Sequence, residues 1–134
     1  MKDLERRQVA LDKTVGKYRE RQVNFVAADC VRMTRFHLLQ MGHKPPRLPQ
    51  YRSMLGARRA LERAGGLVAV FDSILPRIAP ARMLPGDIAV LPGEGGDAAV
   101  IYQCFDKFIG CHQDEAKIVN LVVDLGVLTA AWRA

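Results

Sequence analysis

The residue with the clearest chemical potential is Cys30, which follows Asp29 at the start of an apolar-periodic segment. Asp is a preferred N-cap residue, because its carboxylate accepts hydrogen bonds from the free amides of a first helical turn. A cysteine directly after such a cap lies where the helix dipole stabilises a thiolate. The pattern predicts a helix that begins at Cys30 and carries a nucleophilic thiol, which would need a nearby base for catalysis.

Three histidines are candidate bases for Cys30. His112 is the best of them, although it lies at the far end of a predicted strand, and a surface or turn position is preferred. His37 follows Cys30 by two turns of the same predicted helix, which is too far for a direct hydrogen bond. His43 lies in a Pro-rich loop that leaves its position open. Cys30 as a small buried apolar residue is therefore preferred over Cys30 as a nucleophile.

The two other cysteines, Cys104 and Cys111, lack the short Cys-x-x-Cys spacing of structural zinc sites. They could pair across a hairpin or pack in the core, and core packing is preferred. The glycines of 93–96 lack the Lys-Ser/Thr that follows a phosphate-binding loop, so they predict a turn. The sequence thus predicts neither a metal nor a cofactor.

The chain has 134 residues, of which 49% are hydrophobic, and this predicts a single domain over 1–134. No apolar run is long enough to predict a membrane span, and residues 1–13 contain no apolar core of a secretory signal. Three cysteines, an odd number, argue against a disulfide framework. The net charge of +6 comes without a nucleic-acid-binding motif, so nucleic acid is not an expected partner.

Residues 1–80 have mainly the hydrophobic period of helices. Helices are predicted over 2–22, from Cys30 to about Met41, from Ser53 to Ala64, and over 67–74. On the first helix the predicted inward stripe is Leu4, Leu11, Val15 and Tyr18. The rest of its surface is strongly basic, through Arg6, Arg7, Lys13, Lys17, Arg19 and Arg21.

From Gly86 the period becomes that of strands, which are predicted over 87–91, 98–104, 107–112 and 117–123. The tail over 125–132 is ambiguous, and a short helix is preferred there. Helices followed by an antiparallel meander over 86–123 predict an α+β fold, with N-terminal helices packed on a small antiparallel sheet.

The Asp29-Cys30 helix start, the Gly86-Asp87 strand start and the following meander resemble the NlpC-type, papain-like cysteine peptidases. The resemblance implies that Cys30 occupies the nucleophile position, on a helix packed against the sheet. The histidine position of the superfamily falls on Ala98 and its third polar position on Gly110. The resemblance therefore implies a peptidase fold with degenerate catalytic residues.

A closer resemblance covers nearly the whole chain and is carried by an ordered set of short motifs. The set is Phe25-x-x-x-Asp29-Cys30, Tyr51-Arg-Ser, Ala60-Leu61 leading to Ala64-Gly65-Gly66, Pro85-Gly86-Asp87-Ile88-Ala, and Ala131-Trp132-Arg133. It is similar to a small NlpC-like family encoded in phage and prophage tail modules. The resemblance implies a distal component of a phage tail.

We therefore expect a structural component of a phage tail tip or baseplate, found in the virion tail and in the bacterial cytoplasm during assembly. Other tail proteins are the expected partners, with the basic first helix and the Pro-rich 44–49 loop as contact surfaces, and peptidoglycan is a further candidate. The first alternative is an active cysteine hydrolase that opens peptidoglycan, with Cys30 as nucleophile and His112 or His43 as base. The second is a tail assembly chaperone that never enters the particle.

Overall fold

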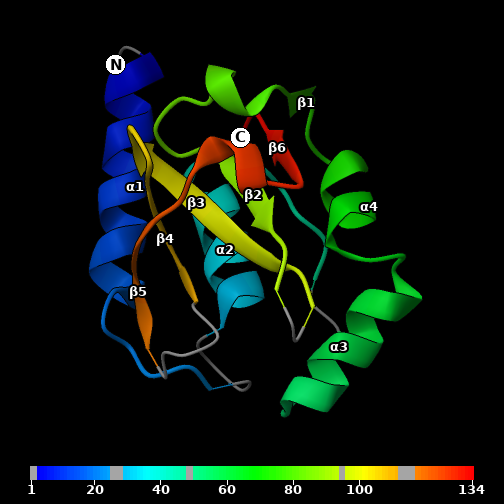
Figure 1. The fold of residues 1–134 in the computed structure, drawn as a ribbon. Helices are drawn as coiled ribbons and strands as arrows, with labels where there is room; N and C mark the ends of the chain where they lie inside the picture. The colour runs from blue at the N-terminus through cyan, green and yellow to red at the C-terminus, as the bar shows by residue number, and fades with distance from the viewer. Residues whose placement is uncertain (1–2, 25–28, 48–49, 94–95, 112–116) are drawn as a thin grey trace.

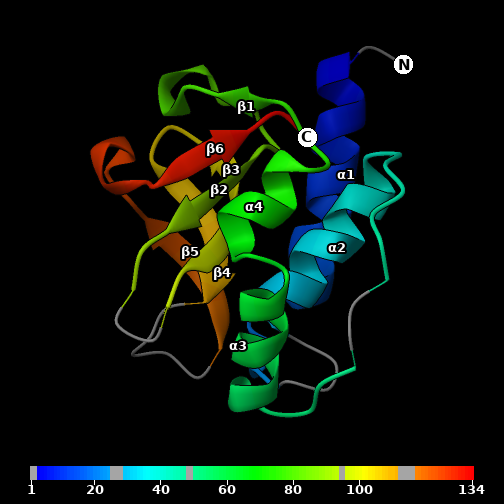
Figure 2. The ribbon, with the colours of Figure 1, turned by 90° about the vertical axis from the view of Figure 1, so that its right-hand side faces the viewer.

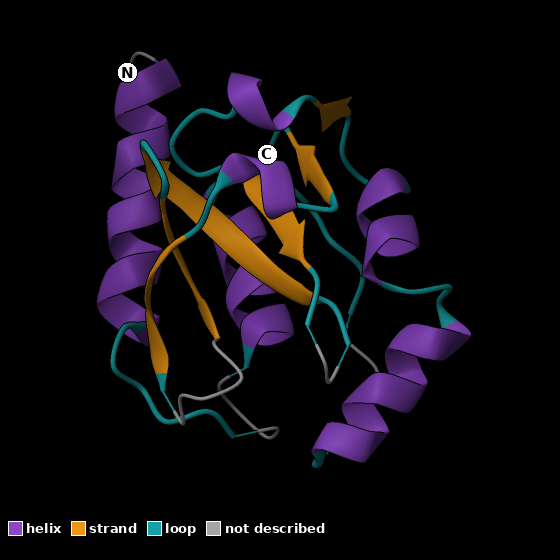
Figure 3. Cartoon of the chain, in the orientation of Figure 1, coloured by secondary structure: helices purple, strands orange, loops and turns teal. Residues whose placement is uncertain are grey.

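The computed structural model describes residues 3–24, 29–47, 50–93, 96–111 and 117–134. Helices and strands follow one another in two blocks, as the change of period at Gly86 predicts (Figures 1 and 3). The helices are α1 (Asp3–Tyr18), α2 (Cys30–Gln40), α3 (Met54–Arg63) and α4 (Leu67–Asp72). The strands are β1 (Arg77–Ile78), β2 (Ile88–Leu91), β3 (Ala98–Cys104), β4 (Lys107–Cys111), β5 (Ile118–Val122) and β6 (Ala130–Trp132).

Two of the helix starts have the caps that the sequence predicts. The Asp29 carboxylate accepts from the amide of Arg32 at the start of α2, and the Ser53 hydroxyl accepts from the amide of Gly56 at the start of α3. Gly42 follows α2 with a φ of +89°, the left-handed conformation that ends many helices. These caps fix the first residue of α2 at Cys30.

The strands form one antiparallel sheet in the order β1-β6-β2-β3-β4-β5. The four predicted strands are present as β2 to β5, but β1 and β6 were not predicted. The preferred helix in the tail is wrong: a 3-10 turn, η2 (Leu125–Val127), is followed by β6, which lies between β1 and β2. Three residues are too few to reveal a strand by alternation.

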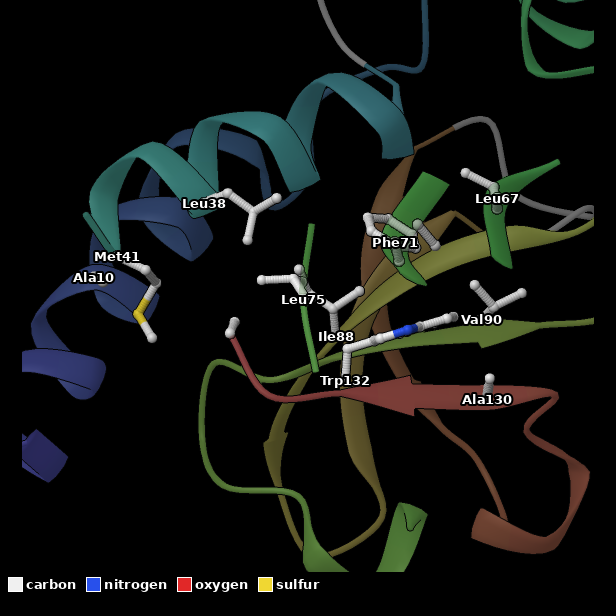
Figure 4. Close-up of a cluster of buried hydrophobic side chains, with 12 residues drawn as sticks. Ala10, Leu38, Met41, Leu67, Phe71, Leu75, Ile88, Val90, Ala130 and Trp132 are labelled. Carbon is white, nitrogen blue, oxygen red and sulfur yellow. The ribbon is translucent and has the colours of Figure 1, made fainter. Parts of the chain in front are cut away.

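Helices α1, α2 and α4 cover one face of this sheet, with α2 over its centre (Figure 2). Leu38 and Met41 of α2 point towards Ile88 and Trp132 of the sheet, and Phe71 of α4 lies against the Trp132 ring at 5.1 Å between centroids (Figure 4). Leu11 and Tyr18 of α1 share a second cluster, which includes Ile101 and Ile109.

The opposite face of the sheet is also covered, by short irregular segments instead of helices. Met83, after the 3-10 turn η1 (Pro80–Arg82), and Leu125 of η2 pack with Val100 and Phe108 from this face. Each central strand therefore buries both of its faces. For this reason the sequences of β2 and β3 are nearly continuous runs of apolar residues. In the described part of the chain, no helix has the length and apolarity to cross a membrane.

The inward face of α1 differs from the predicted stripe. Leu4 is 59% exposed, whereas Arg7 is only 4% exposed. The Arg7 guanidinium donates to Asp87 Oδ1 at 2.9 Å and to the carbonyl oxygen of Ala134 at 2.6 Å. Asp87 is fully buried, and its oxygens also accept from the amides of Leu84 and Ala134. Arg7 thus belongs to the core and not to the predicted basic surface.

We expect Arg7→Leu to lower the free energy of unfolding by about 3–5 kcal/mol, because it removes the buried guanidinium that donates to Asp87 Oδ1 and leaves the carboxylate with the longer Arg133 contact, at 3.4 Å from Oδ2. Arg6→Leu is the matched control, since Arg6 is exposed and pairs with the exposed Asp3, and it should cost about 0–1 kcal/mol. Urea denaturation measures both values. Equal costs for the two variants would show that the buried ion pair does not hold α1 in place.

Candidate functional site

Cys30 lies at the first position of α2, beside a buried acidic group. Asp29 is 3% exposed, and its Oδ1 accepts from the amide of Arg32 at 2.9 Å. Its second oxygen forms a close ion pair with the Arg32 guanidinium. The prediction that Asp29 is an N-cap is therefore confirmed, and its carboxylate is occupied by structural partners.

Tyr51 completes this cluster from the segment before α3. Its hydroxyl donates to both oxygens of Asp29, at 3.1 and 3.2 Å. The Arg32 guanidinium lies 4.3 Å from the centre of the Tyr51 ring and donates to the Tyr51 carbonyl oxygen at 3.1 Å. Burial, together with the nearby Asp29 charge, raises the pKa of Tyr51, so this hydroxyl stays a donor. The cluster holds the start of α2 rigidly against residue 51.

The sheet presents Ala99 and Cys111 to the Cys30 sulfur. Cys111 of β4 donates its S–H to Cys30, and the backbone N–H of Ala99 in β3 donates as well. These hydrogen bonds lower the pKa of Cys30, the Cys111 contribution being the largest. The same contact, with burial, raises the pKa of Cys111, because its proton is held between the two sulfurs.

Gly110, which the resemblance matches to the third polar position, faces away from Cys30. Successive strand residues face opposite sides, and Ala99 and Cys111 are on the helix side with Cys30. A Cβ built on Gly110 would lie 2.6 Å from Val100 Cγ1, which belongs to the opposite face. The conclusion about chemistry is unchanged, since neither Ala99 nor Cys111 is an imidazole.

None of the described histidines reaches Cys30. His37 is fully buried between α1 and the start of β2, where Nε2–H donates to the Gly86 carbonyl at 2.8 Å and Nδ1 accepts from the Thr14 hydroxyl at 2.9 Å. His43 follows the opposite end of α2, roughly 16 Å along the helix from Cys30. The candidate base His112 lies outside the described residues.

Two surface hollows lie away from the cysteine pair. One is between α1 and the β3–β4 hairpin and is lined by residues that include Asp12, Gln103 and Lys107. The other is smaller and is lined by residues that include His43 and Pro45. Cys30 lines neither of them.

The described residues also contain no group of three His, Cys, Asp or Glu side chains that could hold a metal ion. Cys104 is exposed at the other end of β3, opposite Lys107, so Cys104 and Cys111 do not pair across their hairpin. Sequence reasoning missed the contact between Cys30 and Cys111. The only sequence signal for this contact was the alternation of inward and outward residues along β4. That alternation is hidden, because the neighbouring Phe108 and Ile109 are both apolar and both buried.

Comparison with known proteins agrees with this architecture. The sequence matches DUF6950, a domain of unknown function, over residues 2–134. The fold is similar to the crystal structure of the P60 domain from the M. avium paratuberculosis antigen MAP1272c, with a TM-score of 0.60 and 13% sequence identity. The similarity covers 97% of this chain and 96% of that chain. No curated protein matches the sequence. The predicted α+β, NlpC/P60-like fold is confirmed.

We expect acid to destabilise the protein through His37. Burial lowers the pKa of His37 to about 4 from an unfolded value near 6.5, so the unfolded chain binds more protons between these pH values. The stabilisation is complete above pH 6.5 and is lost as the pH falls towards 4, by up to about 3 kcal/mol. Urea denaturation across this range should show a flatter pH dependence in His37→Gln. His43→Gln, at a half-buried histidine, should keep most of the slope, and equal slopes in all three proteins would contradict the assignment.

We expect Asp29→Ala to lower the free energy of unfolding by about 2–4 kcal/mol, because it removes a cap and strands the Arg32 and Tyr51 donors. Ser53→Ala is the matched control, since Ser53 caps α3 with one exposed hydrogen bond, and it should cost about 1 kcal/mol. Thermal and urea denaturation compare the two. A cost for Asp29→Ala no larger than that of Ser53→Ala would mean that Asp29 acts as a cap alone.

Proposed function

The chain belongs to the DUF6950 family of domains of unknown function, and we propose that it is a structural component of a phage tail tip or baseplate, built on an inactive NlpC/P60-like fold. Its place would be the virion tail, and the bacterial cytoplasm during assembly. Its partners would be neighbouring tail proteins. The fold serves in this proposal as a packing module, because the same fold can carry an active site or lose one.

The observation that carries the proposal is the set of groups around the Cys30 sulfur. Amide cleavage by a thiolate needs a proton donor for the departing amine, and an imidazole normally fills this role. Here the sulfur meets the Ala99 amide and the Cys111 thiol. Because hydrogen bonding to Cys30 and burial raise the pKa of Cys111, its thiol is a poor acid for a leaving amine.

The phage tail assignment is supported by the ordered motifs of the sequence and by the structural roles of the motif residues in the fold. Asp29 caps α2, Asp87 holds the buried Arg7, and Trp132 fills the core beside α4. Each of these motif residues stabilises the framework, and none of the described histidines reaches Cys30. Such a chain is suited to a structural role, in which its surfaces bind neighbouring proteins and its thiol takes no part.

Active peptidoglycan hydrolysis is the second candidate function, and one observation favours it. Cys30 has the features of an activated nucleophile, since it starts a helix and hydrogen bonds from Cys111 and Ala99 lower its pKa. Such an enzyme would require a base from outside the described residues, and His112 is the candidate for that role. The two functions predict different effects of removing the Cys30 thiol: the hydrolase would lose its activity, whereas the structural component would be unaffected.

We expect purified phage-like particles to contain the chain, and the isolated protein to release no fragments from peptidoglycan. Cys30→Ala should leave particle assembly and infectivity unchanged, because the proposal gives its sulfur no role. Trp132→Ala is the contrasting variant: it removes the central aromatic of the core, so it should cost about 3–5 kcal/mol and reduce incorporation. Mass spectrometry of the particles and a muropeptide-release assay provide the measurements.

Two results would overturn this proposal in different directions. Peptidoglycan hydrolysis that disappears in Cys30→Ala would establish the enzyme instead of the scaffold. A chain required for assembly but absent from finished particles would establish the assembly chaperone.

A further inference from the structure

One edge of the sheet is formed by β5, whose outward backbone groups can be identified from its pairing with β4 (Figure 1). Alternate residues of a strand turn their N–H and C=O groups towards one neighbour or the other. The Val123 N–H donates to the Asp106 carbonyl, in register with the β4–β5 pairs, so the odd-numbered residues of this stretch bond to β4. The backbone groups of Ile118, Asn120 and Val122 therefore point outwards, away from β4.

The protein itself covers the first part of this edge and leaves the rest open. The Ile118 N–H donates to the Arg21 carbonyl, and the Ile118 carbonyl accepts from the Glu20 N–H. The outward backbone groups of Asn120 and Val122 have no hydrogen-bond partner in the part of the chain that the structure describes. Two N–H groups and two carbonyls thus remain open, directly beyond a residue that already pairs with a second segment.

The open half of β5 also lacks the features that protect many edge strands from other chains. Charged side chains, proline, bulges and very short strands provide that protection. The stretch from Val119 to Val122 has no charge and no proline, and its pairing with β4 is regular. Val122 is apolar and yet 78% exposed. At the opposite edge β1 has only two residues, so β5 is the edge that is suited to pairing.

We propose that the open half of β5 binds an extended segment of a partner polypeptide, which adds a further strand to the sheet. The segment exchanges main-chain hydrogen bonds with Asn120 and Val122. It carries an aliphatic side chain opposite Val122, which covers the exposed valine, and it has no proline at its paired positions. The paired stretch is short, because residues 20 and 21 occupy the edge at Ile118 and the turn η2 begins after Asp124.

A second copy of this chain is a poorer occupant of the edge than a free extended segment. Two β5 strands paired about a twofold axis would place both helix layers on the same side of the joined sheet. Leu11 and Tyr18 of α1 pack in the cluster that contains Ile118, so the two α1 helices would be brought against each other. A segment without a helix avoids this. The inference goes beyond the proposed scaffold function and does not depend on it, because an active hydrolase could present the same edge.

The test uses the full chain and, as the probe, random short peptides displayed on yeast and selected for binding to it. Val122→Pro removes only an outward N–H, so it should melt close to the parent but bind the selected peptides at least roughly tenfold more weakly. Val122→Thr is the matched control, since it keeps the N–H and the β-branched shape, and it should retain binding. In the parent, a bound peptide should slow hydrogen exchange of the Asn120 and Val122 amides at least roughly tenfold.

A second measurement leaves the protein unchanged, so that folding of a variant is not in question. N-methylation of one alternate set of peptide residues should abolish binding, because their N–H groups face β5, whereas methylation of the other set should not. The proposal is overturned if both sets behave alike, if the selected peptides bind Val122→Pro as tightly as the parent, or if no peptide protects the amides of Asn120 and Val122. A dimer of the free chain that Val122→Pro dissociates would also overturn it, because a second copy would then occupy the edge.

Discussion

The buried ion pair between Arg7 and Asp87 is the constraint on which the rest of the fold depends. A guanidinium and a carboxylate removed from water must be fully hydrogen-bonded to each other and to their neighbours. Here the neighbours come from Pro85, Leu84 and Ala134, so that the pair joins α1, the start of β2 and the segment after β6. A pair of this kind adds little net free energy compared with apolar residues, but it specifies which surfaces meet.

The position of Cys30 follows from this pair through a short series of contacts. Docking of α1 places Thr14 against His37, and His37 in turn binds the Gly86 carbonyl directly before Asp87. These hydrogen bonds fix the middle of α2 against both α1 and the sheet. The cluster of Asp29, Arg32 and Tyr51 then fixes the first turn. A thiol held so firmly at a helix start is the expected scaffold of a nucleophile, yet none of the described histidines lies beside it.

Sequence patterns predicted most elements because each depends on local chemistry. The caps at Asp29 and Ser53 and the bounds of β3 required no knowledge of distant residues. The failures have long-range causes. Arg7 is buried because its partner is Asp87, and the helical stripe cannot show a partner from a later strand. The inward face of β3 and β4 could not be identified from the sequence, because both strands bury both faces and this removes the alternation.

The placement of β6 between β1 and β2 has a consequence for the order of events during synthesis. Among the described strands, β1 pairs with β6, and β2 pairs with β6 on one side and with β3 on the other. Before residues 130–132 are synthesised, β1 therefore lacks its partner and β2 has one unpaired edge. Until then the nascent chain exposes two open strand edges, which are the surfaces through which unfinished chains associate. Contacts so distant in sequence also slow the search for the native topology. The ribosome must therefore release residues 130–132 before this sheet can close.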